Sequence, residues 1–218
     1  MPEIMFTGPA GRLEGRYQHT KTDSNRIAII LHPHPQYGGT MNNKVVYEMF
    51  YAFQRKGFSV LRFNFRGAGR SQGEFDAGIG ELADAASALD WLQAMNPTAN
   101  ECWIAGFSFG AWIGMQLLMR RPEIHGFISV APPANMYDFT FLAPCPSSGL
   151  IVAGGADMVA PEPDVAKLVQ RLSAQRGIKI TYSVIPDANH FYDDKIEPLI
   201  AEIEKYLDMR LDHPVEER

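Results

Sequence analysis

The sequence predicts an α/β fold, a three-layer αβα sandwich with a mostly parallel sheet and an antiparallel hairpin at its N-terminus. Short apolar runs alternate along the chain with segments in which apolar residues recur at helical spacing. Most of the runs are continuous, as in parallel strands that are covered on both faces. This alternation of strands and helices favours right-handed crossovers with helices on both sides of the sheet.

The first twenty residues predict the hairpin. Glu3–Thr7 is one expected strand, Gly8–Gly11 supplies the turn residues Gly-Pro-Ala-Gly, and Arg12–His19 is the second strand. In the second strand polar residues alternate with the other face, and these polar residues are Arg12, Glu14, Arg16 and Gln18.

Apolar runs predict six strands after the hairpin, and helical periodicity predicts five helices. The helix that is apolar all round should be the most buried, and Pro198 is tolerated only in the first turn of the last helix. The expected strands are Ile27–Leu31, Ser59–Phe65, Cys102–Phe107, Gly126–Ala131, Leu150–Ala153 and Ile178–Ile185. The expected helices contain Val46–Phe53, Leu82–Leu89, the all-apolar Ala111–Met119, Val165–Leu172 and Ile196–Ile203.

The composition predicts one globular domain, 1–218, because 218 residues with 46% hydrophobic and 21% charged residues can bury a generous core. The formal net charge is −5 and the basic residues are scattered, so nucleic-acid binding is not expected. Cys102 and Cys145 lack the spacing of a metal site or a disulfide framework. Met1–Gly15 has no signal-peptide pattern, and no run approaches the roughly twenty apolar residues of a membrane span. We therefore expect a cytoplasmic protein without cofactor or membrane partner, as a monomer or a homodimer.

A G-x-S-x-G pattern, Gly106-Phe107-Ser108-Phe109-Gly110, lies between an expected strand and an expected helix. In open α/β sheets, reactive groups gather at the carboxyl ends of the strands. A nucleophilic serine needs this spacing because it sits on a sharp, strained turn where nearby side chains would collide. The helix that follows directs its amide groups and positive dipole end toward the reacting oxygen. Short patterns of this kind also arise by chance, but the position between strand and helix favours Ser108 as a nucleophile.

A serine hydroxyl is a weak nucleophile until a base takes its proton and a third group orients that base. The expected chain order is serine, acid, histidine. Asp157 follows the strand Leu150–Ala153 in a Gly-Gly-Ala-Asp loop, and His190 alone among six histidines follows a late strand. We therefore predict Asp157 and His190 as the partners of Ser108. Helix capping is the simpler interpretation of five other acidic residues, Asp187, Asp193, Asp194, Glu162 and Asp164.

These motifs resemble those of the α/β-hydrolase superfamily over nearly the whole chain. Leu31–Pro35, with the sequence Leu-His-Pro-His-Pro, resembles the superfamily's His-Gly loop, and Asn64–Ser71 resembles its Asp-x-Arg-Gly-x-Gly-x-Ser loop. Asn64 stands where that loop has an acidic residue. The combination is similar to small bacterial serine hydrolases without a cap domain, and it implies a mechanism better than a substrate. The match continues through Gly106–Gly110, Gly155–Asp157 and Asn189-His190.

Acyl transfer needs hydrogen-bond donors where negative charge develops, and loss of one such donor costs about 10²–10³ in rate. We expect the backbone N–H of Phe109 to be one donor. Pro33, which replaces the superfamily's glycine, and Pro35 have no N–H. The second donor is therefore expected to be the backbone N–H of His34, which matches the superfamily's oxyanion position, with Gln36 as the alternative.

Two histidines at i, i+2 also suggest metal ligands, but a catalytic zinc site needs about three ligands and no third is identifiable. We therefore expect no metal. His32 is expected to brace its loop by hydrogen bonding. Arg66 is expected to anchor its glycine-rich turn rather than to bind phosphate.

The substrate surface is expected to be open and shallow. Hydrolases of this type often insert a lid before the strand Leu150–Ala153, but here only 132–149 precede it, too few for a helical cap. Phe139, Phe141 and Leu142 in this segment fit an apolar substrate wall or core packing equally well. The residues predicted to bind substrate are Tyr37, Met136, Tyr137 and Phe191.

Together, these features favour a serine hydrolase that cleaves a small carboxylic ester through an acyl-enzyme intermediate. Thioesters, amides and lactones pass through the same intermediates, and the motif does not exclude a peptidase. The alternative is a catalytically idle scaffold that acts as a ligand-binding module, because a fold does not fix a function.

Overall fold

The computed structural model describes residues 3–22 and 24–212, and it confirms the predicted α/β architecture. Eight strands form one sheet in the order β1-β2-β4-β3-β5-β6-β7-β8. The strands are β1 (Glu3–Gly8), β2 (Gly11–Gln18), β3 (Arg26–Leu31), β4 (Ser59–Phe63), β5 (Glu101–Phe107), β6 (Ile124–Val130), β7 (Gly149–Gly154) and β8 (Ile180–Ile185). The α-helices are α1 (Lys44–Arg55), α2 (Ile79–Met95), α3 (Phe109–Leu118), α4 (Glu162–Ser173) and α5 (Ile196–Asp212).

The sheet is parallel except at its N-terminal hairpin. β1 pairs antiparallel with β2, β2 pairs antiparallel with β4, and the remaining pairs are parallel. Leu31 at the end of β3 pairs with Gly106 of β5, and Gly154 at the end of β7 pairs with Ile185 of β8. The loops that follow these four strands therefore leave the sheet at the same end, which brings distant segments of the chain close together.

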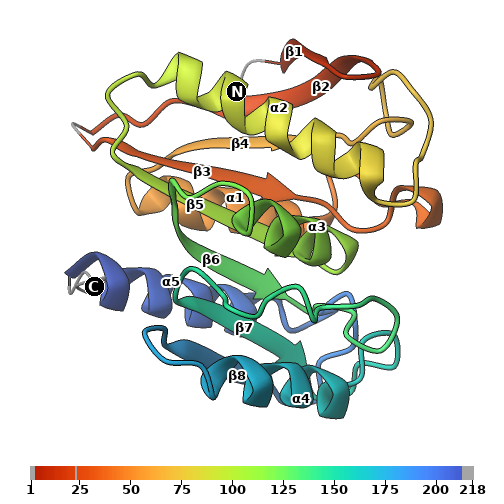
Figure 1. Ribbon diagram of the computed structural model, residues 1–218, viewed down its shortest axis with the longest axis vertical. Coiled ribbons are helices and arrows are strands. Elements are labelled where there is room, and N and C mark those ends of the chain that lie inside the picture. Colours follow the sequence, from red (N-terminus) through yellow and green to blue (C-terminus); the bar gives the residue numbers. More distant parts are fainter. Residues whose placement is uncertain (1–2, 23, 213–218) are drawn as a thin grey trace.

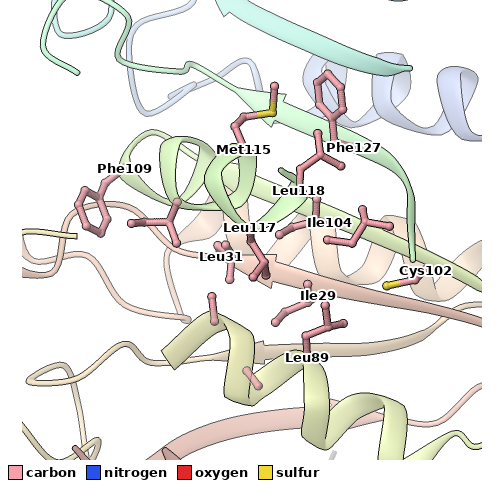
Figure 2. Packing of buried hydrophobic residues seen from close by; sticks show 14 of the residues in the cluster. Ile29, Leu31, Leu89, Cys102, Ile104, Phe109, Met115, Leu117, Leu118 and Phe127 are labelled. Atoms are coloured by element: carbon pink, nitrogen blue, oxygen red, sulfur yellow. The ribbon is translucent and has the colours of Figure 1, made fainter. Parts of the chain in front are cut away.

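Helices cover both faces of the sheet and enclose two apolar cores. α2, α3 and α4 pack on one face, and α1 and α5 pack on the other (Figure 1). Eight of the ten residues of α3 are buried, as its apolar sequence predicts. Figure 2 shows Leu117 and Leu118 of α3 near side chains of the sheet, among them Ile29 and Ile104. Phe109 lies at the N-terminal end of α3, next to the sheet edge where the loops gather.

β4 ends two residues earlier than predicted, because the chain leaves the sheet after Asn64. The N–H of Asn64 still donates to the carbonyl of Glu14 in β2 (2.8 Å), whereas that of Phe65 donates to Nε2 of His32 (2.9 Å). Glu14, on the polar side of the predicted hairpin, is buried, and its Oε2 accepts hydrogen bonds from Asn64 Nδ2 and Arg70 N (both 2.8 Å). Glu14 thus places a carboxylate next to Asn64, the position at which the superfamily's loop itself has an acidic residue.

The loop after β4 is fixed to α2 by a buried ion pair. The Arg66 guanidinium binds both carboxylate oxygens of Asp84, with Nε at 3.0 Å from Oδ2 and Nη2 at 2.8 Å from Oδ1. The backbone N–H of Arg66 also donates to Asp84 Oδ2 (3.0 Å). This contact raises the pKa of Arg66 and confirms that its side chain anchors the turn. Of the helices within 3–22 and 24–212, none has the length and apolar character needed to cross a membrane.

Candidate active site

Ser108 occupies a sharp turn between β5 and α3. Its φ of 55° and ψ of −119° are unfavourable for a residue with a side chain, and such strain is typical of reactive positions. The two glycines of the motif are required by close approach of the backbone. A Cβ on Gly106 would lie 2.3 Å from the carbonyl oxygen of Gly110, and one on Gly110 would lie 2.4 Å from that of Leu31. The motif therefore packs the first turn of α3 directly against the ends of β3 and β5.

His190 bridges Ser108 and Asp157. Nε2 of His190 lies 3.0 Å from Oγ of Ser108, and its Nδ1 lies 2.8 Å from Oδ2 of Asp157. The carboxylate accepts only, so Nδ1 carries the proton and Nε2 is left as the acceptor for the serine hydroxyl. The three predicted residues, which follow β5, β7 and β8, are thus brought into one hydrogen-bonded chain.

Asp157 is held in place by its own loop. Its Oδ1 accepts hydrogen bonds from the backbone N–H groups of Val159 and Ala160, each at 2.8 Å. Its side chain has no exposed surface. A carboxylate whose other oxygen is bound in this way can present Oδ2 to His190 in only one orientation. The site therefore joins an imidazole to a carboxylate of fixed orientation, the arrangement that the predicted triad requires.

The other acidic residues do not contact His190. Asp193 accepts a hydrogen bond from Asn189 Nδ2 (3.0 Å) on the exposed side of the loop. The N-cap of α4 is Pro161, without a side-chain capping bond, so the expected capping by Glu162 and Asp164 is wrong. Both lie in the first turn, where the helix dipole favours negative charge, and Glu162 accepts a hydrogen bond from the Tyr182 hydroxyl (2.7 Å).

The predicted oxyanion donors flank Ser108. Phe109 is the first residue of α3, so its backbone N–H has no acceptor within the helix. The His34 ring lies 4.9 Å from the Phe109 ring, which places the loop after β3 beside the nucleophile turn. Neither backbone N–H has an acceptor among the described residues, whereas that of Gln36 donates to His34 Nδ1 (3.2 Å). This arrangement favours His34 over Gln36, and both oxyanion roles stay predictions.

His32 braces the loop as predicted. Its ring is fully buried, with Nε2 accepting from the N–H of Phe65 (2.9 Å) and Nδ1 donating to the carbonyl of Pro33 (2.6 Å). The two bonds fix a neutral tautomer. Burial lowers the pKa of His32 to about 4. Burial also lowers the pKa of His34, whose ring lies at the edge of the cavity.

A cavity of about 390 Å³ opens beside Ser108, His34 and His190. This volume is near the lower end of the roughly 300–1,000 Å³ range of small-molecule sites. The four residues predicted to bind substrate all line it: Tyr37, Met136, Tyr137 and Phe191.

The segment between β6 and β7 divides between cavity and core. Met136 and Tyr137 line the cavity, whereas Phe139 and Leu142 are buried in the core that α2, α3 and α4 cover. Phe141 packs against that same core. The apolar wall is therefore shorter than the one the sequence allows, because the chain turns inward after Tyr137.

Three other lining residues were not predicted to lie there: Pro33, Asn43 and Val159. Asn43 is the N-cap of α1 and follows the loop after β3. Its position beyond the carboxyl end of a strand is the sequence feature from which its place at the cavity could have been predicted. Val159 lies two residues after Asp157 and donates to it. Among residues 3–22 and 24–212, no group of three or more His, Cys, Asp or Glu side chains is arranged to hold a metal ion.

Comparison with known proteins agrees with this geometry. A family model described as X-Pro dipeptidyl-peptidase (S15 family) matches residues 2–192. The protein ATU1826 of Agrobacterium tumefaciens, a protein of unknown function described as an alpha/beta hydrolase, is 65% identical with a TM-score of 0.95, and the match covers 98% of each chain. XC6422 of Xanthomonas campestris, described as an a/b serine hydrolase without lid, is 33% identical with a TM-score of 0.86, covering 96% of this chain and 94% of that one. The uncharacterized protein RP471 of Rickettsia prowazekii is 53% identical over 95% of this chain and 89% of its own length.

Proposed function

The chain belongs to the S15 family of serine peptidases within the α/β hydrolases, and from this premise we propose that it hydrolyses small, uncharged carboxylic esters. The observation that supports this most is the hydrogen-bonded chain from Ser108 through His190 to Asp157, with links of 3.0 and 2.8 Å. It joins a nucleophile, a base and an orienting carboxylate beside a cavity of small-molecule size.

In the proposed reaction, Ser108 Oγ attacks the ester carbonyl while His190 Nε2 takes the hydroxyl proton. The oxyanion accepts hydrogen bonds from the backbone N–H groups of Phe109 and His34. As the tetrahedral intermediate collapses, His190 returns the proton to the leaving alcohol and the acyl group stays on Ser108. Water, deprotonated by His190, then attacks the acyl-enzyme and releases the acid. Asp157 keeps Nδ1 protonated and stabilises the imidazolium that forms in each half of the reaction. Thioesters and lactones of similar size follow the same steps.

The cavity lining favours esters over dipeptidyl substrates. A dipeptidyl-peptidase must hold the free ammonium group of a peptide, and burial of an unpaired charge is costly. The described residues that line the cavity include no Asp, Glu, Lys or Arg. They are mostly apolar or aromatic, with Tyr37, Met136 and Phe191 at its exposed rim. An uncharged acyl group fits this lining better than a peptide N-terminus.

The proposal includes one uncapped domain acting in the cytoplasm. The segment between β6 and β7 runs from 131 to 148 and contains no helix, which fits a site open to small esters. Cys102 and Cys145 are both free thiols, which fits a reducing compartment.

The test compares the wild type with Ser108→Ala and His190→Ala. The wild type should react with a fluorophosphonate probe and hydrolyse p-nitrophenyl acetate and butyrate, and labelling should vanish in Ser108→Ala. An X-Pro-p-nitroanilide should be a poorer substrate than either ester. A wild type that neither labels nor hydrolyses any ester would instead support the idle, ligand-binding scaffold. Faster cleavage of the p-nitroanilide would support a peptidase.

A further inference from the structure

Asn43 carries a side-chain amide whose orientation is fixed by α1. Its Oδ1 accepts hydrogen bonds from the backbone N–H groups of Val45 (3.0 Å) and Val46 (3.4 Å). A side-chain amide has one oxygen acceptor and one NH₂ donor. Because the oxygen is bound to the helix, Nδ2 is the group that remains to donate. No described residue accepts a hydrogen bond from it, and Asn43 lines the cavity beside Ser108.

The segment that carries Asn43 is held by buried polar residues at the end of β4. Oδ1 of Asn64 accepts from the backbone N–H of Met41 (2.8 Å). Arg62, buried on β4, donates to the carbonyl of Met41 and to Oδ1 of Asn42. A donor supported in this way is already ordered before a substrate binds, so little entropy is lost when it forms a hydrogen bond.

Asn43 also differs from Ser108, His190, Tyr37 and His34, which line the same cavity. Ser108 and His190 are engaged with one another, and Tyr37 extends into solvent with 86% of its surface exposed. His34 uses Nδ1 to accept from Gln36, and its ring packs against Phe109. Asn43 therefore offers an uncharged, oriented donor in a mostly apolar cavity that has no charged lining residue.

We propose that Asn43 is a specificity-determining residue whose Nδ2 donates to a second oxygen of the substrate. The preferred substrates are then uncharged esters that carry a carbonyl, ether or hydroxyl oxygen besides the scissile ester group. A plain alkyl ester of the same shape leaves the donor unpaired and reacts more slowly. This inference rests on the proposed esterase function, and the second oxygen belongs to either the acyl or the alcohol part of the ester.

Two pairs of isosteric substrates distinguish these positions. p-Nitrophenyl 3-methoxypropanoate and p-nitrophenyl pentanoate differ by one oxygen in the acyl part. 2-Methoxyethyl acetate and butyl acetate differ by one oxygen in the alcohol part, and their hydrolysis is followed by pH-stat. For each pair, the ratio of kcat/KM for the oxygen-containing ester to that for the alkyl ester is compared between proteins. Differences in intrinsic reactivity cancel in this comparison.

The variants Asn43→Ser and Asn43→Thr keep a capping oxygen for α1 and remove the amide donor. The matched control is Asn100→Ser, because Asn100 is an exposed asparagine that does not line the cavity. In one of the two pairs, the ratio should fall about 5- to 10-fold in both Asn43 variants, as expected for one net hydrogen bond, and should stay at the wild-type value in Asn100→Ser. Two variants are used so that poor folding of one does not decide the result.

Equal ratios in the wild type and both Asn43 variants, in both pairs and with an active wild type, would overturn the role of Asn43 alone. A wild type that hydrolyses none of the four esters would overturn the proposed function and this inference together.

Discussion

The imidazole of His190 and the carboxylate of Asp157 lie 2.8 Å apart in a buried pair, although 33 residues separate them in the chain. Only Oδ2 of Asp157 faces the ring, because Oδ1 is bound by the N–H groups of Val159 and Ala160. Because the two carboxylate oxygens have separate partners, Oδ2 holds the ring proton of His190 on Nδ1. Replacement of that one oxygen is therefore expected to change the tautomer.

Asp157→Asn should reverse that tautomer. The asparagine oxygen will keep the two backbone N–H donors, so its NH₂ group will face Nδ1 of His190 and force the ring proton onto Nε2. His190 can then no longer accept the Ser108 proton, and kcat for p-nitrophenyl butyrate should fall by about 10³–10⁴ at pH 7. Thermal unfolding measured in parallel should show a folded protein. A loss of less than tenfold would contradict the assigned orientation.

Gly110→Ala should destabilise the protein, because the new Cβ would lie 2.4 Å from the backbone oxygen of Leu31. Relief of that clash requires movement of α3 against β3, at a cost of roughly 2–4 kcal/mol of unfolding free energy. Gly114→Ala in the same helix is the matched control. Its Cβ would meet only side-chain atoms at ordinary contact distances, those of Ile104 at 3.4 Å and Leu31 at 3.6 Å. The variant should therefore be neutral or gain up to about 1 kcal/mol from helix propensity. Urea denaturation measures both, and equal effects would contradict the close approach.

His32 should make stability depend on pH. Burial lowers the pKa of His32 from 6.5 to about 4, so between these values the unfolded chain binds a proton that the folded protein does not. This contribution is complete above pH 6.5 and is lost as the pH falls toward 4, to a total of about 3 kcal/mol. His32→Gln, which keeps a donor and an acceptor, should lose less stability than the wild type between pH 7 and pH 4. Parallel curves for the two proteins by chemical denaturation would rule out this role.

Asn64→Asp, which restores the acidic residue that the superfamily's loop carries, should destabilise this chain. The new carboxylate would replace an amide that lies 2.8 Å from Oε2 of buried Glu14, so two acceptors of like charge would face each other. We expect a loss of roughly 1–3 kcal/mol at pH 7. The double variant Glu14→Gln with Asn64→Asp restores a donor and an acceptor between the two side chains. It should recover part of the loss, because an NH₂ group at the place of Oε2 cannot also accept from the N–H of Arg70. A single variant as stable as the wild type, by urea denaturation, would show that the pair is not coupled.

Much of the site could be predicted from local sequence. The glycines around Ser108 mark a turn that few other sequences form, and the order of strands and helices places Asp157 and His190 at the same edge of the sheet. The Arg66 anchor was also predictable, because a glycine-rich turn needs a fixed partner. The length of β4 was not, since its end depends on whether the amide of Phe65 bonds to a neighbouring strand or to the ring of His32.

By itself, the sequence determined the α/β fold, the nucleophile turn and the two residues that partner the serine, because periodicity and turn chemistry are encoded over short stretches of chain. Only the tertiary structure decided that Glu14 lies beside Asn64, that the chain turns from cavity to core after Tyr137, and that the amide of Asn43 lines the cavity. These relationships depend on how strands pair and helices pack, which brings together side chains whose separation in the sequence carries no information about their distance in space.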